Sequence, residues 1–243
     1  EVPMEQSKTE RPTPGLNQNQ LKLIAAAAML IDHIGAELLP GVLALRIIGR
    51  LAFPVFSYFI YEGSRYTHDR RAYLTRMLGL GLVCVAAYYV YDGELYGNVL
   101  ITFSLSICVL YAVQGWKRQR DGRHLAVVAL CLLGAYLLCA LFTVDYGFLG
   151  VLLPVLAEVC DLPPERRARL PRFLGERLPL VGFGVGLLLL SLQTGWVQPY
   201  SLFSLLLLLA YNGQRGSRRM KHFFYWFYPL HLLVIGGVSM LLS

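Results

Sequence analysis

Long apolar stretches recur along the whole chain, and short polar connections separate them. A helix of roughly 20 apolar residues is long enough to cross the hydrocarbon core of a bilayer. The pattern therefore predicts an all-α fold, a polytopic transmembrane helical bundle with about nine spans. We expect these spans near residues 20–39, 43–62, 72–91, 97–115, 124–142, 146–160, 178–194, 198–212 and 221–242. The sixth stretch is short and contains Pro154, so a tilted or re-entrant segment, and a total of about eight or ten spans, are the alternatives.

The connections between these stretches alternate in charge. Basic residues are concentrated in loops 63–76, 116–123, 161–177 and 213–221, as Arg65, Arg70, Arg71, Arg76, Lys117, Arg118, Arg120, Arg123, Arg166, Arg167, Arg169, Arg172, Arg177, Arg215, Arg218, Arg219 and Lys221. The alternate connections carry the acidic residues Glu37, Asp92, Glu94 and Asp145. Since cytoplasmic loops of membrane proteins are enriched in Lys and Arg, we expect the amino terminus in the cytosol and the carboxyl terminus outside.

Composition agrees with a membrane protein and excludes other classes. The chain is 15% charged and 56% hydrophobic, whereas soluble domains carry about 25% charged residues. The basic loops account for the net charge of +7, and the sequence contains no nucleic-acid-binding motif, so we expect no nucleic-acid partner. Its five cysteines form no CxxC pair and have no zinc-ligand spacing with histidine, so we expect no metal. We expect a polar lead over residues 1–20 and a single membrane domain over residues 21–243.

Candidate chemistry begins in the first apolar stretch, LKLIAAAAMLIDHIG, where Asp32 and His33 are adjacent. Ionisable side chains inside a membrane are costly unless they are paired or solvated, so they mark functional sites. Lys22 precedes His33 by eleven residues, which places both on one stripe of a helix with Met29 between them. We expect His33 to act as a general base. Asp32 either orients the His33 ring or pairs with an arginine of another helix, and a purely structural ion pair is the alternative.

The second span contains two arginines, Arg46 and Arg50, which share a helix face one turn apart. Guanidiniums inside a membrane need partners, unless they extend to the headgroups. The candidate partners are Asp32, Asp145 and a ligand oxygen. Pro54 should kink this helix, because proline has no N–H for the carbonyl four residues earlier. Glu62 lies near the cytosolic end of the span, where a loop arginine is its expected partner.

Polar residues at later helix starts complete the predicted site. Asn98 and Thr102 share a face at the start of the fourth span and could donate hydrogen bonds into a cavity. Asp145 opens the sixth span, either as a site residue or as a helix N-cap. His231 follows Pro229 near the middle of the last span, together with Tyr228, and is a second buried ionisable group.

Several stretches match, in order, segments characteristic of a known family: LKLIAAAAMLIDHIG, IIGRLAFPVFSYFIYEGSRYTHDRRAYLTRML, NVLITF, DYGFLGVLLP, YNGQRG and FYWFYPLHLLVI. They cover most of residues 21–235, and the set resembles the TraX family, named for the conjugation protein that acetylates the amino terminus of pilin. The chain is also similar, more distantly, to membrane acyltransferases that modify extracytoplasmic sugars. Those enzymes carry an arginine where this chain has Lys22, and a segment like the one between Tyr228 and His231.

The resemblance implies an integral acyltransferase of the bacterial inner membrane, surrounded by membrane lipid. It implies acetyl-CoA or another acyl-CoA as the cytosolic donor, and an extracytoplasmic peptide amine, sugar or small molecule as the acceptor. His33 would deprotonate the acceptor while Arg46, Arg50 or Asn98 stabilises the oxyanion, with a covalent acyl-histidine as a variant. Lys22, Thr102, Asp145, Tyr228 and His231 would bind the substrates. The rival interpretations are a small transporter whose buried charges form a pathway, and a structural scaffold.

The charge alternation generates a first prediction, on topology. A cysteine introduced as Gln119→Cys should react with membrane-impermeant reagents only from the cytosolic side, because loop 116–123 is one of the basic loops. Labelling of this cysteine from the outside of intact cells would reverse the orientation.

Overall fold

The computed structural model describes residues 14–193, 195–216 and 220–242. Most of the polar lead, Arg218 and Arg219 of the last basic loop, and Ser243 lie outside these residues. The described chain contains no strand, and its helices are α1 (Gln18–Glu37), α2 (Leu43–Gly49), α3 (Ala52–Tyr66), α4 (Arg70–Asp92), α5 (Val99–Gln119), α6 (Gly122–Leu141), α7 (Gly147–Cys160), α8 (Pro164–Arg167), α9 (Arg172–Gln193), η1 (Gln198–Phe203), α10 (Ser204–Leu209) and α11 (Lys221–Leu242).

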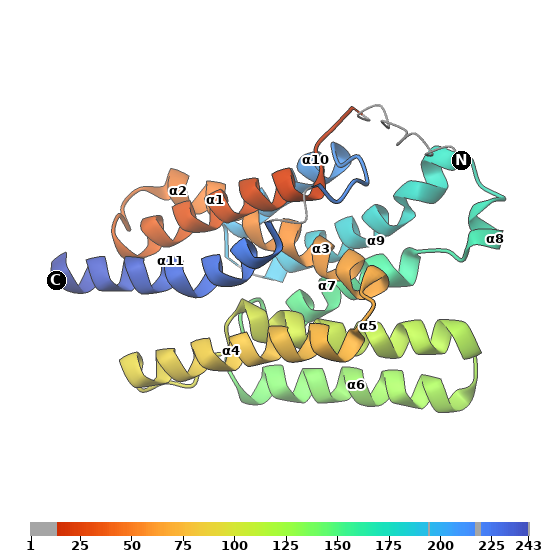
Figure 1. The fold of residues 1–243 in the computed structure, drawn as a ribbon, viewed down its shortest axis with the longest axis horizontal. Helices are drawn as coiled ribbons and strands as arrows, with labels where there is room; N and C mark the ends of the chain where they lie inside the picture. The colour runs from red at the N-terminus through yellow and green to blue at the C-terminus, as the bar shows by residue number, and fades with distance from the viewer. Residues whose placement is uncertain (1–13, 194, 217–219, 243) are drawn as a thin grey trace, which may run out of the picture.

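Each predicted span contains helix, so the all-α fold class is confirmed (Figure 1). Six helical segments are long and apolar enough to cross a membrane, namely Leu43–Tyr66, Arg70–Val90, Val99–Gln119, Gly122–Leu141, Leu174–Gln193 and Phe223–Leu242. Helix α1 and the shorter apolar segments Gly147–Cys160 and Gln198–Leu209 do not belong to this set. The count of nine crossings and the orientation of the termini therefore stay predictions.

Helix α1 begins earlier than predicted because its first turn is capped. The Asn17 side chain accepts from the Gln20 N–H at 3.0 Å, and the Gln20 side chain accepts from the Asn17 N–H at 2.9 Å. This reciprocal capping box satisfies donors that would otherwise lack partners. The Leu16 N–H also donates to the carbonyl of Ala210 at 2.8 Å. The end of the predicted polar lead, from Leu16 onward, thus belongs to the folded body.

The second predicted span is divided where Pro54 requires it. Helix α2 ends at Gly49 and α3 begins at Ala52, so Arg50 and Leu51 form the junction. Pro54 has no N–H for the carbonyl of Arg50, which lies four residues earlier. The expected kink is confirmed, and it falls next to one of the candidate arginines.

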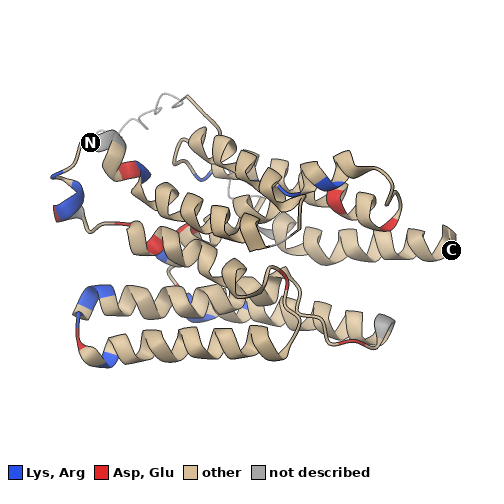
Figure 2. Cartoon of the chain, turned by 180° about the vertical axis from the view of Figure 1, so that it is seen from behind, with Lys and Arg blue, Asp and Glu red and all other residues tan. Residues whose placement is uncertain are grey.

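The two ends of the bundle differ in charge (Figure 2). We call one the basic end; it holds the α3–α4, α5–α6, α7–α9 and α10–α11 connections, with most of the Lys and Arg residues. The opposite, acidic end holds the α1–α2, α4–α5, α6–α7 and α9–η1 connections. There the Gly97 N–H donates to the Thr143 carbonyl and the Asp145 N–H donates to the Gly97 carbonyl, both at 2.8 Å, which joins two connections distant in sequence.

The helices divide into an inner set and an outer set. The large cluster of buried apolar side chains is drawn mainly from α3, α5, α7 and α9, with Phe53, Ile107, Leu153 and Phe183 among its members. Helices α4, α6 and α11 carry mostly exposed apolar side chains. In a bilayer these outer faces meet lipid, where exposed leucine and valine cost nothing.

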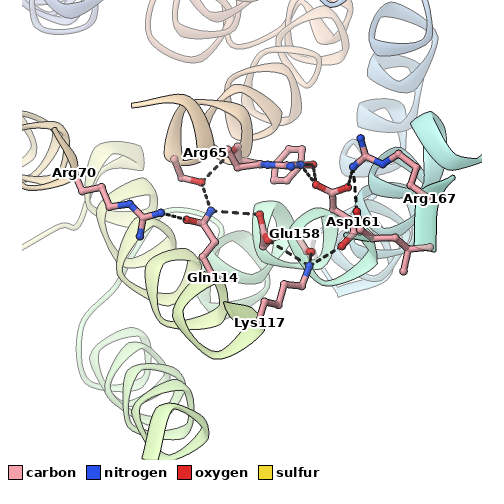
Figure 3. A network of polar contacts seen from close by, with 10 residues as sticks. Arg65, Arg70, Gln114, Lys117, Glu158, Asp161 and Arg167 are labelled. Carbon is pink, nitrogen blue, oxygen red and sulfur yellow. Dashed lines mark hydrogen bonds and ion pairs between the residues drawn. The ribbon is translucent and has the colours of Figure 1, made fainter. Parts of the chain in front are cut away.

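A cluster of ion pairs fixes the basic end (Figure 3). Asp161, which is 5% exposed and follows α7, pairs with both Arg65 of α3 and Arg167 of α8. Glu158, on the last turn of α7, pairs with Lys117 of α5 at 3.3 Å. Three of the basic residues that were used to predict the membrane orientation thus connect neighbouring helices to the end of α7.

This cluster generates a stability prediction. Asp161→Asn should lower the free energy of unfolding by about 1.5–3 kcal/mol, because two part-exposed guanidiniums lose their charge-assisted hydrogen bonds to a buried carboxylate. Glu165→Gln, at an exposed position of α8, should change it by less than about 0.5 kcal/mol. Unfolding of the two variants in the same detergent compares them, and equal stability would mean that the cluster is not structural.

Candidate functional site

A cavity of about 1230 Å³ extends from the basic end of the bundle to the acidic end. Helices α1, α3, α4, α5 and α11 supply most of its wall. Near the basic end it is lined by Lys22, Glu62, Tyr66, Arg76 and Arg215. Its middle is apolar, with Met29, Phe56, Ile60, Met77 and Leu80. Near the acidic end it is lined by Asp32, His33, Arg46, Arg50, Glu94, Tyr96, Asp145 and Tyr146.

At the acidic end, the Asp32 carboxylate binds two guanidiniums. Arg50 donates from Nη2 to both carboxylate oxygens, at 2.8 and 2.7 Å. Arg46 lies 3.0 Å from Oδ1 and also donates to the Asp32 carbonyl at 3.0 Å. The shared face of the two arginines and their pairing with Asp32 are confirmed. Because its carboxylate is committed to these arginines, Asp32 does not hold the His33 ring.

A glycine makes this arrangement possible. A Cβ atom added at Gly49 would lie 2.2 Å from both Cβ and Oδ1 of Asp32. Such a contact is far shorter than van der Waals distance, so only glycine allows α2 to approach α1 this closely. Gly49 thus sets the distance over which Arg46 and Arg50 reach the carboxylate.

The His33 ring lies against the ring of His231, with centroids 5.1 Å apart. His231 Nδ1 is 2.8 Å from the Phe227 carbonyl, which can only accept, so Nδ1 donates and Nε2 is the acceptor of the neutral ring. His231 is 5% exposed, and its Nε2 has no hydrogen-bond partner among the described residues. Tyr228 lines the cavity and packs edge-on against the same ring. The predicted convergence of α1 and α11 is therefore observed.

Lys22, Met29 and His33 all line the cavity, as their common helix stripe predicts. Lys22 Nζ lies 5.3 Å from the centre of the Phe59 ring and 5.8 Å from that of Phe224. The expected partner of Glu62 was wrong: its carboxylate accepts from the Tyr211 hydroxyl at 2.9 Å, not from a loop arginine.

The two residues predicted at the start of the fourth span, Asn98 and Thr102, differ in their position relative to the cavity. Asn98 caps α5 by accepting from the Leu100 N–H, and its amide donates to the Gly81 carbonyl at 2.9 Å. Thr102 is fully buried outside the cavity wall and donates to the Asp145 carbonyl at 2.7 Å. The Thr102 hydroxyl is therefore committed to the protein. Asn98 also lines the cavity and its amide carries a second N–H, so its role as an oxyanion donor stays a prediction.

Asp145 lines the cavity but is not the N-cap of α7, a position occupied by Tyr146. Its carboxylate accepts from the Tyr96 hydroxyl at 2.5 Å and from the Val99 N–H at the start of α5. Burial raises the pKa of the Asp145 carboxyl, and these two hydrogen bonds oppose that shift. Asp145 therefore joins the loops of the acidic end and faces the cavity.

Tyr146 is a site residue that the sequence did not reveal. Its backbone is left-handed, with φ of 61°, a conformation that non-glycine residues rarely adopt outside constrained sites. Its ring stacks on Phe53 at 3.6 Å between centroids, and its phenol lies within electrostatic range of Arg50 and Asp32. A Cβ at Gly150 would lie 2.5 Å from Tyr146 Cβ, so the glycine four residues later makes room for it. That Tyr-Gly-x-x-Gly spacing is the signal that could have found it.

Comparisons with known proteins agree on one family. The family profile described as TraX protein matches residues 17–239. A probable fimbrial assembly protein FimC, serogroup H1, from Dichelobacter nodosus is 28% identical over 250 residues, covering 92% of this chain and 96% of that protein. Protein TraX of Escherichia coli is 29% identical over 160 residues, 65% of this chain and 61% of its own length. An uncharacterized protein of Rickettsia prowazekii is 31% identical over 145 residues, covering 59% and 56%. No solved structure matches the chain.

The close approach at Gly49 generates a prediction on packing. Gly49→Ala should destabilise the protein by about 1–3 kcal/mol, because the added methyl group overlaps Asp32. Gly79→Ala is the matched control, since a Cβ at this helical position meets nothing within 4 Å. The control should be neutral or slightly stabilising, as alanine favours helix over glycine by roughly 0.5–1 kcal/mol. Equal unfolding temperatures for both variants would contradict the packing described for α1 and α2.

Proposed function

Because this chain belongs to the TraX family, we propose that it is an integral membrane acyltransferase. It moves an acyl group, acetyl in the simplest case, from an acyl-CoA at the basic end to an amine or hydroxyl acceptor at the acidic end. Its family and its apolar helices make it a multi-pass bacterial membrane protein, and by the charge of its loops the basic end faces the cytosol.

One observation carries this proposal: a single cavity joins both ends of the bundle and passes His33. Donor and acceptor need to meet without either one crossing the membrane, and such a cavity provides the meeting point. Its apolar middle suits the slender neutral arm of a thioester donor, while charged groups lie at both ends. His33 lies where the apolar middle meets the polar acidic end.

The chemistry follows from the groups near His33. His33 removes a proton from the acceptor amine or hydroxyl, which attacks the thioester carbon and expels the CoA thiolate. Both arginines line the cavity, but Arg50 donates to Asp32 and Gln198, whereas Arg46 is more exposed. Arg46 and the Tyr146 hydroxyl are therefore the donors best placed for the oxyanion. His231 is a positioning residue, because its ring packs on His33 and its own Nδ1 is held by the Phe227 carbonyl.

A transporter is the second candidate, and the same cavity is the observation that favours it. Its polar ends and continuous length would also suit a pathway for a small solute. The two functions differ in their product: only the acyltransferase forms a covalent bond between labelled acyl group and acceptor.

The role of His33 is tested by replacing it. His33→Ala should fold normally, since it removes one side chain at the wall of an existing cavity. Acyl transfer should fall by about 10²–10⁴-fold, the usual effect of losing a general base. His124→Ala, in the first turn of α6 and outside the cavity lining, is the matched control and should keep normal transfer. Transfer of labelled acetyl groups to candidate acceptors provides the measurement.

Near-normal transfer by a folded His33→Ala variant would remove His33 as the base. His231→Ala then becomes the deciding variant, because His231 is the neighbouring imidazole with a free acceptor nitrogen among the described residues. Solute flux without acylated product, in proteoliposomes of the unmodified chain, would favour the transporter.

A further inference from the structure

We infer that Lys22, Arg76 and Arg215 form a binding site for the phosphate groups of the donor, at the basic end of the cavity. This inference rests on the proposed acyltransferase function and assigns its donor site to particular residues. The ligand chemistry is a phosphate-linked pantetheine arm, whether carried by CoA or by an acyl carrier protein.

The first step is that these three cations converge from separate elements. Lys22 belongs to α1, Arg76 to α4, and Arg215 to the connection between α10 and α11, yet all line the same cavity. None of them has a carboxylate within ion-pair distance in the described part of the chain. Lys22 and Arg215 instead lie over aromatic rings, Arg215 at 5.1 Å from the centre of the Tyr66 ring. Such contacts hold a cation in place and leave its N–H donors available.

Other cations of the basic end are committed elsewhere. Arg65, Lys117 and Arg167 are paired with the carboxylates of Asp161 and Glu158 (Figure 3). Arg70 donates to the Gln114 side chain and Arg120 lies over the Trp116 ring. None of these five lines the cavity. The three cations at its mouth are thus distinguished by position and by having no carboxylate in direct contact, although Glu62 lies within electrostatic range of Lys22 and Arg215.

The charge balance of this mouth favours an anion. Among the described residues that line this end of the cavity, Glu62 supplies the one carboxylate. It accepts a hydrogen bond from the Tyr211 hydroxyl. Three cations against one carboxylate leave two net positive charges. The first turn of α1, with Gln18 and Asn19, lines the same mouth and directs the positive end of its helix dipole there. Arginine forks bind phosphate oxygens in pairs, so an anion with several phosphate oxygens fits cations spread over three elements.

The shape of the cavity selects among phosphate ligands. Beyond the mouth, the wall becomes apolar at Met29, Phe56 and Leu80 and continues to His33. A ligand that fills this path has phosphates at one end, a long uncharged arm, and its reactive group at the other. Phosphopantetheine thioesters have this form, and inorganic phosphate or a free nucleotide does not.

The test measures binding of CoA and of pantetheine to the purified full chain in nanodiscs. CoA should bind more tightly than pantetheine, and added salt should weaken CoA binding alone. Arg76→Gln and Arg215→Gln should each raise the Kd for CoA about tenfold or more, the usual effect of losing a charge-assisted hydrogen bond, and should leave pantetheine binding unchanged. Both positions are exposed, so these variants should fold. Arg118→Gln, an exposed arginine of α5 that does not line the cavity, is the matched control.

Each outcome decides the inference separately from the proposed function. If Arg76→Gln and Arg215→Gln bind CoA like the Arg118→Gln control, or if CoA and pantetheine bind equally, the phosphate site is overturned even where acyl transfer is observed. If the predicted losses occur without any acyl transfer, the phosphate site stands and the acyltransferase proposal fails. Transfer from acyl-CoA identifies CoA as the source, whereas transfer from acylated carrier protein alone identifies the protein-bound arm.

Discussion

The ion pair between Asp32 and two arginines is the interaction on which the acidic end of the bundle depends. A single charge buried in a membrane protein is costly, so a carboxylate and guanidiniums persist there only when they satisfy one another. Arg50 binds both oxygens of the Asp32 carboxylate, and Arg46 binds one of them and the carbonyl. Asp145 also lines this end of the cavity and lies within electrostatic range of Arg50, so the two guanidiniums face more than one carboxylate.

The surrounding backbone is shaped to bring these groups together. Pro54 divides the second span at Arg50, and Gly49 lets α2 lie directly against Asp32. Tyr146, the N-cap residue of α7, completes the wall in a left-handed conformation for which Gly150 provides space. Strained or close-packed backbone of this kind is found where function fixes the geometry. Each of these features positions a side chain at the end of the cavity that holds His33.

Local patterns in the sequence were sufficient for the helices and for part of the site. Hydrophobic runs predicted the helices, because a segment buried in a bilayer needs to be long and apolar. Helical periodicity predicted that Lys22, Met29 and His33 lie on one wall of the cavity. The pairing of Asp32 with arginines also followed, since buried charges need partners. These inferences depend on the spacing of residues within one helix, or on the requirement that a buried charge have an oppositely charged partner.

Contacts between distant segments could not be predicted in the same way. Thr102 looks like a site residue until its partner, the carbonyl of Asp145, is known. The left-handed Tyr146 and the Tyr211 partner of Glu62 likewise depend on how remote helices pack. The cavity is formed by many helices and connections together, so the sequence of one segment does not show which loop cations line it.

The proposed function requires that one cavity bring a donor from the basic end to an acceptor from the acidic end. Proteoliposomes with acceptor enclosed, and with the basic end of the protein facing outward, test it directly when radiolabelled acetyl-CoA is added outside. We predict that label becomes covalently attached to the enclosed acceptor while intact acetyl-CoA stays outside. Labelling of acceptor only on the donor side, or entry of unreacted acetyl-CoA into the vesicles, would contradict the proposed function.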